Sequence, residues 1–403
     1  MTTTFNVPAH VPMELVQDFS FHSAPGIDRN PAAVIDALRD DRDIVFGIGA
    51  RRGRDSWVFK SYDLLVEAFQ NPGLFSSERF SGFSALLGEN WLLIPPEIDP
   101  PLHKSYRLIL NRLFAPSRMN ELEATIAGEV RALTDAVLPL GSCDFQNAVA
   151  TPLPTAVFLD IMGLPREDAP RFLEWESLLL HSMDMADRAR GGHGIQDYMI
   201  GAIADRERNP RDDVLTQIVT ADIDGRPLTR DEKIGMCFNL YIAGLDTVAA
   251  ALGATFKFLA ENPERQAELR ADREMRPKAI EEILRLNSMV VAGRFVTRDT
   301  EFHGVHLKAG DYVSLPTMFA NRDGAHFDDA SRADFERRNV MSHIVFGTGI
   351  HNCLGSHLAR RELRIVLEEW LDRVPPFRIA DGQNAVTYAS AVVFGVESLP
   401  LAW

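Results

Sequence analysis

One of the three cysteines in this 403-residue chain lies in a glycine-spaced loop, where a sulfur atom has a chemical use. Cys353 belongs to the stretch FGTGIHNCLG (346–355), and the residues directly after it predict a strongly amphipathic helix. Free amides and the dipole at a helix N-terminus favour a thiolate. Gly347 and Gly349 permit positive φ and close approach of the backbone to a ligand. A thiolate in such a protected loop is a metal or haem ligand, or a nucleophile.

Three other interpretations of Cys353 stay open on the residues alone. A lone cysteine is often a small buried hydrophobic residue. His351, Cys353 and His357 would suit zinc, although their spacing is unusual and no second ligand pair is evident. A cysteine–histidine nucleophile needs a base that is close in space, which spacing along the chain does not reveal.

An acid and an alcohol interrupt the longest apolar pattern of the chain. The stretch AGLDT (243–247) contains Asp246 and Thr247 in the middle of a predicted helix. A threonine there can bond back to the carbonyl four residues earlier and bend the helix. Alternatively, the two side chains together can move protons.

A second charged pattern is EEILR, which contains Glu282 and Arg285. The spacing of three places both side chains on one face of a helix. An ordinary surface ion pair has the same spacing and contributes little to stability. The residues alone therefore leave a surface pair and a buried structural pair both open.

Long helical patterns must position these residues. Thr229, with Glu232 three residues later, predicts the capped start of a helix that runs from 230 to about 261. The stretch DRARGGHGIQD (187–197) has the glycine and charge content of a loop between helices. Apolar spacing near 3.6 predicts further helices over 119–137, 167–183, 195–208 and 276–286.

Strand signals are short and late in the chain. Residues 294–316 alternate in the manner of small antiparallel strands, and VVFGVESLPLAW (392–403) suits another pair. Residues 1–30 are rich in proline and predict an irregular segment. The pattern as a whole indicates one mainly α domain with a minor β part over 1–403.

Composition limits the classes of partner and compartment. The net charge of -15 disfavours nucleic-acid and anionic-membrane binding, and three cysteines indicate a reducing compartment. The N-terminus lacks the pattern of a signal peptide. The best candidate for a membrane span, 234–260, is interrupted by Asn239, Asp246 and Lys257. These features predict a cytoplasmic protein with no nucleic-acid or membrane partner.

The loop pattern F-G-x-G-x-H-x-C-x-G resembles the haem-ligand signature of cytochromes P450. It is present without departure as Phe346, Gly347, Gly349, His351, Cys353 and Gly355. From about residue 11 to Trp403 the chain resembles the bacterial camphor-hydroxylase branch of that family, notably in GLDTV, CLGSHLARRE and GVESLPLAW. The resemblance implies a triangular helical prism with small antiparallel sheets. It also implies haem b (iron protoporphyrin IX), with the Cys353 thiolate bound to the iron.

The resemblance also implies roles for other residues. Phe346 and Gly347 would belong to the haem loop, while Asp246 would relay protons and Thr247 would hydrogen-bond bound dioxygen. The residues expected to grip the haem propionates are His103, Arg107, Arg294 and His351. The residues expected to form a buried structural ion-pair cluster are Glu282, Arg285 and Arg338. By the same analogy, 184–196 would form a lid.

The candidates for the substrate pocket follow from matching positions. They are Phe83, Trp91, Asn239, Ala243, Val290, Val291, Val392 and Val393, and plain core packing is the competing interpretation of each. Trp91 stands where the camphor hydroxylases have a ketone-binding Tyr, and Asn239 where they usually have Leu. Ala292 replaces an Asp before the Gly-Arg of the propionate strand. These departures weigh against camphor as the substrate.

The resemblance predicts a monomeric monooxygenase that inserts one oxygen atom of O2 into a small hydrophobic terpenoid or norisoprenoid ketone, of the ionone kind. Electrons would come from a [2Fe-2S] ferredoxin and its NADH-dependent reductase, with docking near Lys104 and Arg107. Alternatives are a camphor-type monoterpene hydroxylase, a non-catalytic haem-thiolate protein and a peroxygenase. The last two have no use for Asp246 and Thr247.

Overall fold

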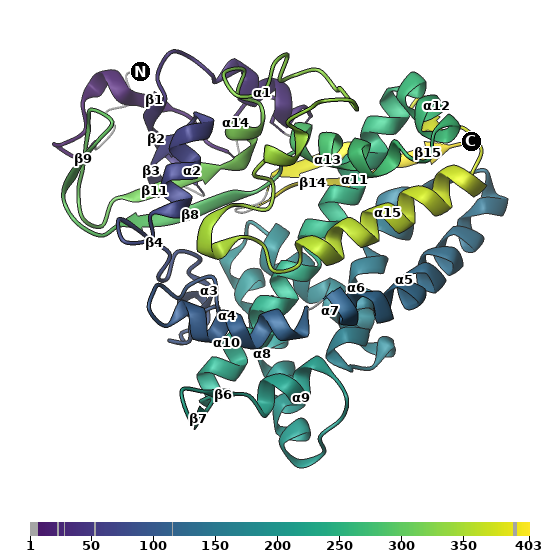
Figure 1. The fold of residues 1–403 in the computed structure, drawn as a ribbon, viewed down its shortest axis with the longest axis horizontal. Coiled ribbons are helices and arrows are strands. Elements are labelled where there is room, and N and C mark those ends of the chain that lie inside the picture. The colour runs from purple at the N-terminus through teal and green to yellow at the C-terminus, as the bar shows by residue number, and fades with distance from the viewer. Residues whose placement is uncertain (1–6, 22–23, 28, 52–53, 115, 390–392) are drawn as a thin grey trace. The chain divides into compact units, whose positions relative to one another are not determined.

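The computed structural model describes the chain except residues 1–6, 22–23, 28, 52–53, 115 and 390–392, and describes 116–119 and 121 by their backbone alone. The residues form two compact units (Figure 1). The first comprises Met1–Phe80, Glu281–Asn352 and Thr387–Phe394, and the second Ser81–Ile280, Cys353–Val386 and Gly395–Trp403. Both units combine segments that are far apart along the chain. The prediction of one domain over 1–403 stays a prediction.

A six-stranded sheet is the centre of the first unit. Its spatial order is β1–β2–β3–β11–β8–β4, with β1 parallel to β2, β3 parallel to β11, and the other pairs antiparallel. The strands are β1 (Val16–Asp18), β2 (Ile44–Arg51), β3 (Arg54–Phe59), β4 (Phe75–Ser76), β8 (Val291–Val296) and β11 (Tyr312–Pro316). A separate hairpin pairs β9 (Thr300–Phe302) with β10 (Val305–Leu307). The antiparallel strands predicted over 294–316 are therefore confirmed.

Aromatic and β-branched side chains explain why these segments form a sheet. Trp57, Phe59, Phe75, Val313 and Leu315 are all fully buried in one apolar cluster. Burying each such side chain stabilises the fold by roughly 1.5–3 kcal/mol. The helices of this unit are α1 (Pro31–Ala37), α2 (Tyr62–Gln70) and α14 (Thr317–Asn321). This packed sheet is a rigid support for the loop that ends at Asn352.

Helices dominate the second unit. They are α3 (Phe83–Leu86), α4 (His103–Leu113), α5 (Pro116–Val137), α6 (Pro152–Met162), α7 (Ala169–Glu176), α8 (Met185–Arg208), α9 (Val214–Val219), α10 (Arg230–Gly244), α11 (Asp246–Glu261), α12 (Pro263–Ala271) and α15 (Ser356–Arg373). Short strands pair β5 (Ser142–Asp144) and β12 (Arg378–Ile379) with β15 (Pro400–Ala402), and β6 (Asp222–Ile223) with β7 (Arg226–Pro227). Three elements contain residues of both units: α13 (Arg276–Leu286), β13 (Val386–Ala389) and β14 (Phe394–Ser398). The mainly α class with a minor β part is confirmed.

The helix α5 holds the cysteine helix in place. Figure 1 shows α15, in yellow, lying along α5, in blue. Arg361 and Arg364 of α15 both bind Glu123 of α5, at 3.0 and 2.7 Å. The predicted helix over 119–137 is confirmed as α5, and the one over 276–286 as α13.

The predicted helix from 230 to about 261 is present but broken at Leu245. Thr229 and Glu232 form a reciprocal capping box at its start, as predicted. Leu245 has φ -95 and ψ -72, which ends α10 and begins α11. The Thr247 hydroxyl donates to the Ala243 carbonyl at 2.9 Å. This hydrogen bond to the carbonyl four residues earlier is one of the two roles that the sequence allows for Thr247. It competes with regular helix geometry at the break.

The length and composition of this broken helix raise the question of a membrane span. Within the described residues, Arg230–Glu261 is long and apolar enough to cross a membrane by length and composition alone, with a mean hydropathy of 1.4 over its best window. However, 78% of that window is buried inside the protein. The core helix of a globular protein passes the same test, so this is weak evidence for a membrane span.

The predicted loop over 187–197 is wrong, because these residues are helical. Asp184 caps α8 by accepting from the amides of Ala186 and Asp187 at 2.7 and 3.1 Å. A Cβ at Gly191 would lie 2.7 Å from the Trp175 carbonyl oxygen, and one at Gly194 only 2.3 Å from the Trp175 indole nitrogen. The glycines therefore serve close helix packing, and this packing outweighs their low helix propensity.

Candidate active site

Cys353 lies three residues before Ser356, the first residue of α15, and its surroundings suit a sulfur ligand. The side chain is accessible, yet protein surrounds the sulfur closely enough for burial to raise the pKa of the thiol. Four groups oppose that effect: the backbone amides of Gly355 and Ser356, which donate to the sulfur, and the guanidinium groups of Arg107 and Arg360. Such donors stabilise the thiolate form once a cation compensates its charge.

The first two predicted propionate partners share α4, in the same unit as Cys353. Arg107 is half-buried and donates from Nε to Asn111 Oδ1 at 3.0 Å. His103 is buried; burial lowers the pKa of its imidazole, Arg107 lowers it further, and Asp99 opposes both. The structure thus brings Arg107 near Cys353, with His103 one turn before it. Their contact with a carboxylate stays a prediction.

The other two predicted propionate partners belong to the first unit. Arg294 is buried in β8, where it donates from Nη1 to the Gly293 carbonyl at 2.7 Å and lies over the ring of Phe69 at 5.5 Å. His351 Nε2 lies 3.1 Å from Ser77 Oγ. These contacts fix both side chains, which is what a preorganised anion site requires.

The loop over 346–352 has the backbone that its glycines predict. Gly347 has φ +67 and Gly349 has φ +72, so both adopt the left-handed region. At Gly349 a Cβ would also lie 2.7 Å from the Phe69 carbonyl oxygen. Only glycine satisfies both conditions at position 349. The role of Phe346 and Gly347 beside haem stays a prediction.

Asp246 is buried at the start of α11 and belongs to an acidic cluster that sequence reasoning missed. Its Oδ1 lies 3.1 Å from Nε2 of His181, whose side chain is 35% exposed. Glu176 is buried nearby, and burial, together with the charge of Asp246, raises its pKa well above the ordinary value. His181 therefore links a buried carboxylate to solvent.

A π-turn explains why that cluster was missed. Glu176 ends α7, and Ser177–His181 then form a π-helical turn. A search for apolar spacing near 3.6 assigns the whole stretch 167–183 to one helix and misplaces its side chains. The sequence does place an acid, Glu176, and a histidine, His181, on either side of the stretch SLLL, and this pair is the signal that could have indicated the cluster.

The helix face around Thr247 is open. Ala243 is exposed, and a Cβ at Gly244 would meet nothing within 4 Å. Thr247 is half-buried, and its hydroxyl already donates to the Ala243 carbonyl. The oxygen of that hydroxyl keeps lone pairs that can accept a further hydrogen bond.

Glu282 and Arg285 form a fully buried pair in the first unit, as the resemblance implies. Arg285 donates to both carboxylate oxygens of Glu282 at 2.8 Å. The predicted third member, Arg338, is wrong: Arg337 Nε lies 3.0 Å from Glu282 Oε1, whereas Arg338 is exposed. Phe335 and Arg337 are buried, whereas the residues at 336 and 338 are exposed, so an error of one position exchanges a buried arginine for an exposed one.

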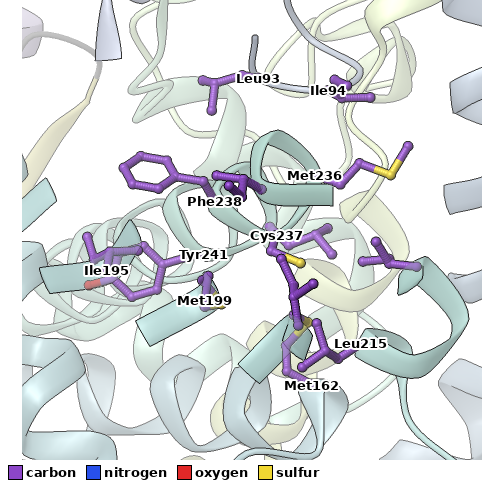
Figure 2. Close-up of a cluster of buried hydrophobic side chains, with 14 of the residues drawn as sticks. Leu93, Ile94, Met162, Ile195, Met199, Leu215, Met236, Cys237, Phe238 and Tyr241 are labelled. Carbon is purple, nitrogen blue, oxygen red and sulfur yellow. The ribbon is translucent and has the colours of Figure 1, made fainter. Parts of the chain in front are cut away.

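The predicted pocket residues divide between the units. In the second unit, the rings of Phe83 and Trp91 lie 6.1 and 4.8 Å from that of Phe238, which Figure 2 shows on α10 with Met236, Cys237 and Tyr241. In the first, Val290 pairs with Val393 in a β-bridge, and Val291 begins β8. Val392 lies outside the described residues. The placement of all these residues around a substrate stays a prediction.

The side chain of Trp91 is buried in the protein interior. It is 2% exposed, and its Nε1 donates to Gln196 Oε1 at 2.9 Å. Gln196 Nε2 in turn donates to Glu89 Oε1 at 3.0 Å. The indole N–H therefore already has a partner within the protein.

Glu362, on α15, gives a prediction about stability. Burial raises the pKa of its carboxyl to about 8, and Oε2 is buried without a hydrogen-bond partner among the described residues. The folded state therefore keeps a proton that the unfolded chain loses near pH 4.5, so stability falls as pH rises from there to about 8. The stability advantage of Glu362→Gln over wild type should grow by about 3 kcal/mol between about pH 4 and pH 7. Urea unfolding at both pH values measures this, and a pH-independent difference would contradict it.

Comparisons with known proteins agree with this geometry. Residues 194–375 match the family model described as Cytochrome P450. The chain is 38% identical to "Probable cytochrome P450 127A1" of Sinorhizobium fredii, over 98% of this chain and 97% of that one. It is 33% identical to a steroid C26-monooxygenase of Mycobacterium tuberculosis, over 85% and 93% of the two chains. The solved structure of cytochrome P450 CYP101C1 superposes with a TM-score of 0.89 and 31% identity, covering 98% and 99%.

The identity extends over nearly the whole chain, and the likeness in structure includes a member of the group that the sequence resembles. The predicted cytochrome P450 fold is thereby confirmed. This chain belongs to the bacterial cytochrome P450 family of haem b monooxygenases.

Proposed function

We propose that this P450 hydroxylates a small hydrophobic ketone of the terpenoid or norisoprenoid class, ionone-like, in the cytoplasm. It would take electrons from a [2Fe-2S] ferredoxin supplied by an NADH-dependent reductase. The observation that carries the proposal is the surroundings of the Cys353 sulfur: burial raises the pKa of the free thiol, while the amides of Gly355 and Ser356 donate to the sulfur and the guanidinium groups of Arg107 and Arg360 lie near it. This donor set fits a haem iron ligand, since amides at the sulfur tune such a bond. Haem b, when bound, supplies the redox centre at which dioxygen is activated.

The residues of this chain would hold that group and manage protons. Cys353 Sγ would ligate the iron, while His103, Arg107, Arg294 and His351 would bind the propionates. Charge-assisted hydrogen bonds from arginine suit carboxylates. An acidic ferredoxin would dock near the exposed Lys104, close to Arg107.

Asp246 and Thr247 support a monooxygenase over a haem-thiolate sensor or a peroxygenase. The carboxylate of Asp246 contacts the solvent-accessible His181, so a proton can pass from the surface to a buried acid. Thr247 lies next in the chain, beside the open face at Gly244. A camphor-type substrate is less well supported, because the Trp91 N–H that would replace a ketone-binding Tyr already donates to Gln196.

The test is the ratio of product formed to NADH consumed with the ferredoxin, the reductase and an ionone. Thr247→Ala should keep NADH consumption within about twofold, but reduce product per NADH at least about tenfold, with peroxide as the balance. Positioned proton-transfer groups contribute about 10²–10⁴-fold in rate, so this loss is well above experimental error.

Thr255→Ala is the matched control for that variant. Thr255 lies in α11 and donates to the carbonyl four residues earlier, Ala251, at 2.7 Å, as Thr247 does to Ala243. It should keep the wild-type ratio of product to NADH. An unchanged ratio in Thr247→Ala would refute the proton role, and absence of product from wild type with every terpenoid ketone would refute the substrate class.

A further inference from the structure

Asn239 is a polar side chain in a run of buried residues on α10. Its neighbours on α10 are core residues, and Figure 2 shows three of them, Cys237, Phe238 and Tyr241, among other buried side chains. Asn239 itself is only 8% exposed. A buried amide is ordinarily hydrogen-bonded, because burial without a partner costs stability.

The Asn239 amide makes no hydrogen bond to the part of the chain that the structure describes. The described residues include several fully buried polar atoms that have no partner, but the oxygen and nitrogen of Asn239 do not belong to that group. Since these two atoms lack a partner and are not fully buried, a small molecule can reach them. The amide therefore faces space that a ligand atom can enter.

Position 239 lies one helical turn before the open face of α10. Ala243, four residues later and on the same face, is exposed, and the Cβ direction of Gly244 is free within 4 Å. The preceding residue, Phe238, packs against Phe83 and Trp91. The Asn239 amide is thus a polar group at the boundary between an apolar wall and the face expected to adjoin dioxygen.

Trp91 does not compete for the same role. Its N–H donates to Gln196, whose amide continues the chain to Glu89, and the indole is almost completely buried. A substrate oxygen would have to break that chain to reach Trp91. Asn239 can donate from Nδ2 without losing any bond.

We propose that Asn239 is the polar anchor that orients the substrate, donating from Nδ2 to a carbonyl oxygen of an otherwise apolar molecule. This inference rests on the proposed monooxygenase function and adds a residue that determines specificity. A single directed hydrogen bond in an apolar pocket selects one orientation of the ligand, and so one C–H bond for oxidation. The anchor lies on α10, and the Trp91 position keeps a structural role.

The experiment compares two probes on the haem-loaded protein: β-ionone and the hydrocarbon in which a methylene replaces its carbonyl. Binding is read from the change in haem spin state. Wild type should bind the ketone about tenfold more tightly than the hydrocarbon, the fold-change expected of one good neutral hydrogen bond. Asn239→Leu, of similar volume, should reduce that ratio to about one without weakening hydrocarbon binding, and should spread hydroxylation over several positions.

Trp91→Phe is the matched control, since it removes an N–H at the competing position. It should keep the ketone preference. Loss of the preference in Trp91→Phe, or its persistence in Asn239→Leu, would overturn the proposal. Asn239→Ala gives the same comparison if leucine impairs folding. The binding ratio needs no turnover, so failure of the anchor is distinct from failure of the monooxygenase function, which would show as binding without product.

Discussion

Cys353→His is expected to reduce product formation more than about 100-fold, a larger loss than the 10–100-fold typical of residues that only support a metal ligand. The imidazole can still bind haem iron, but it lacks the electron donation with which a thiolate favours O–O cleavage. The amides of Gly355 and Ser356 and the two arginines near the sulfur would also lose the anionic ligand they stabilise. Product rate, haem content and the spectrum of the reduced, carbon monoxide-bound protein measure the change.

Cys143→Ser is the control for that variant. Cys143 is half-buried in β5, and burial, together with Asp144, raises the pKa of its thiol to about 12, so it stays neutral at working pH. Its replacement by the nearly isosteric serine should leave activity within about twofold of wild type. An active Cys353→His enzyme would contradict the assignment of the ligand, as would inactivity of Cys143→Ser.

Arg337→Ala is expected to destabilise the protein by about 3–5 kcal/mol, whereas Arg338→Ala should change stability by less than about 0.5 kcal/mol. Glu282 is fully buried and bound by Arg285 and Arg337, and removing either arginine leaves part of its charge uncompensated. Arg338 is exposed. Since natural domains are stable by only about 5–15 kcal/mol, the first loss is a large share of the total.

Urea unfolding of the haem-loaded variants measures this pair of effects. The two substitutions remove the same side chain from adjacent positions, so composition and charge are matched. Equal losses, or a greater loss at Arg338, would show that the buried cluster is built differently. Glu282→Gln, which removes the charge and keeps the shape, should weaken the fold less than Glu282→Ala.

Local rules predicted the elements whose signals lie within a few residues. The capping box at Thr229 and Glu232, the positive φ of Gly347 and Gly349, and the strands over 294–316 follow from the residues themselves. The Glu282–Arg285 contact follows from helical spacing, although its complete burial does not. Each depends on short-range geometry that any fold would respect.

Packing between segments far apart in the chain determines the features that the sequence did not predict. Three glycines predict a loop near residue 191, but Trp175 packs against Gly191 and Gly194 and Leu87 packs against Gly192, so only glycine fits at these helical positions. The π-turn at Ser177–His181 shifts side chains in a way that no periodic pattern signals, so His181 was missed. Likewise, the N–H of Trp91 has a partner 105 positions away along the chain, and only the folded structure reveals it.

The central claim is that the Cys353 sulfur, as a thiolate, binds the haem iron. The most direct measurement is the absorption spectrum of the fully haem-loaded wild-type protein after reduction and addition of carbon monoxide. Thiolate ligation predicts the strongly red-shifted Soret band that gives this family its name. A band at the position found for histidine-ligated haem, in protein that has not been denatured, would contradict the account.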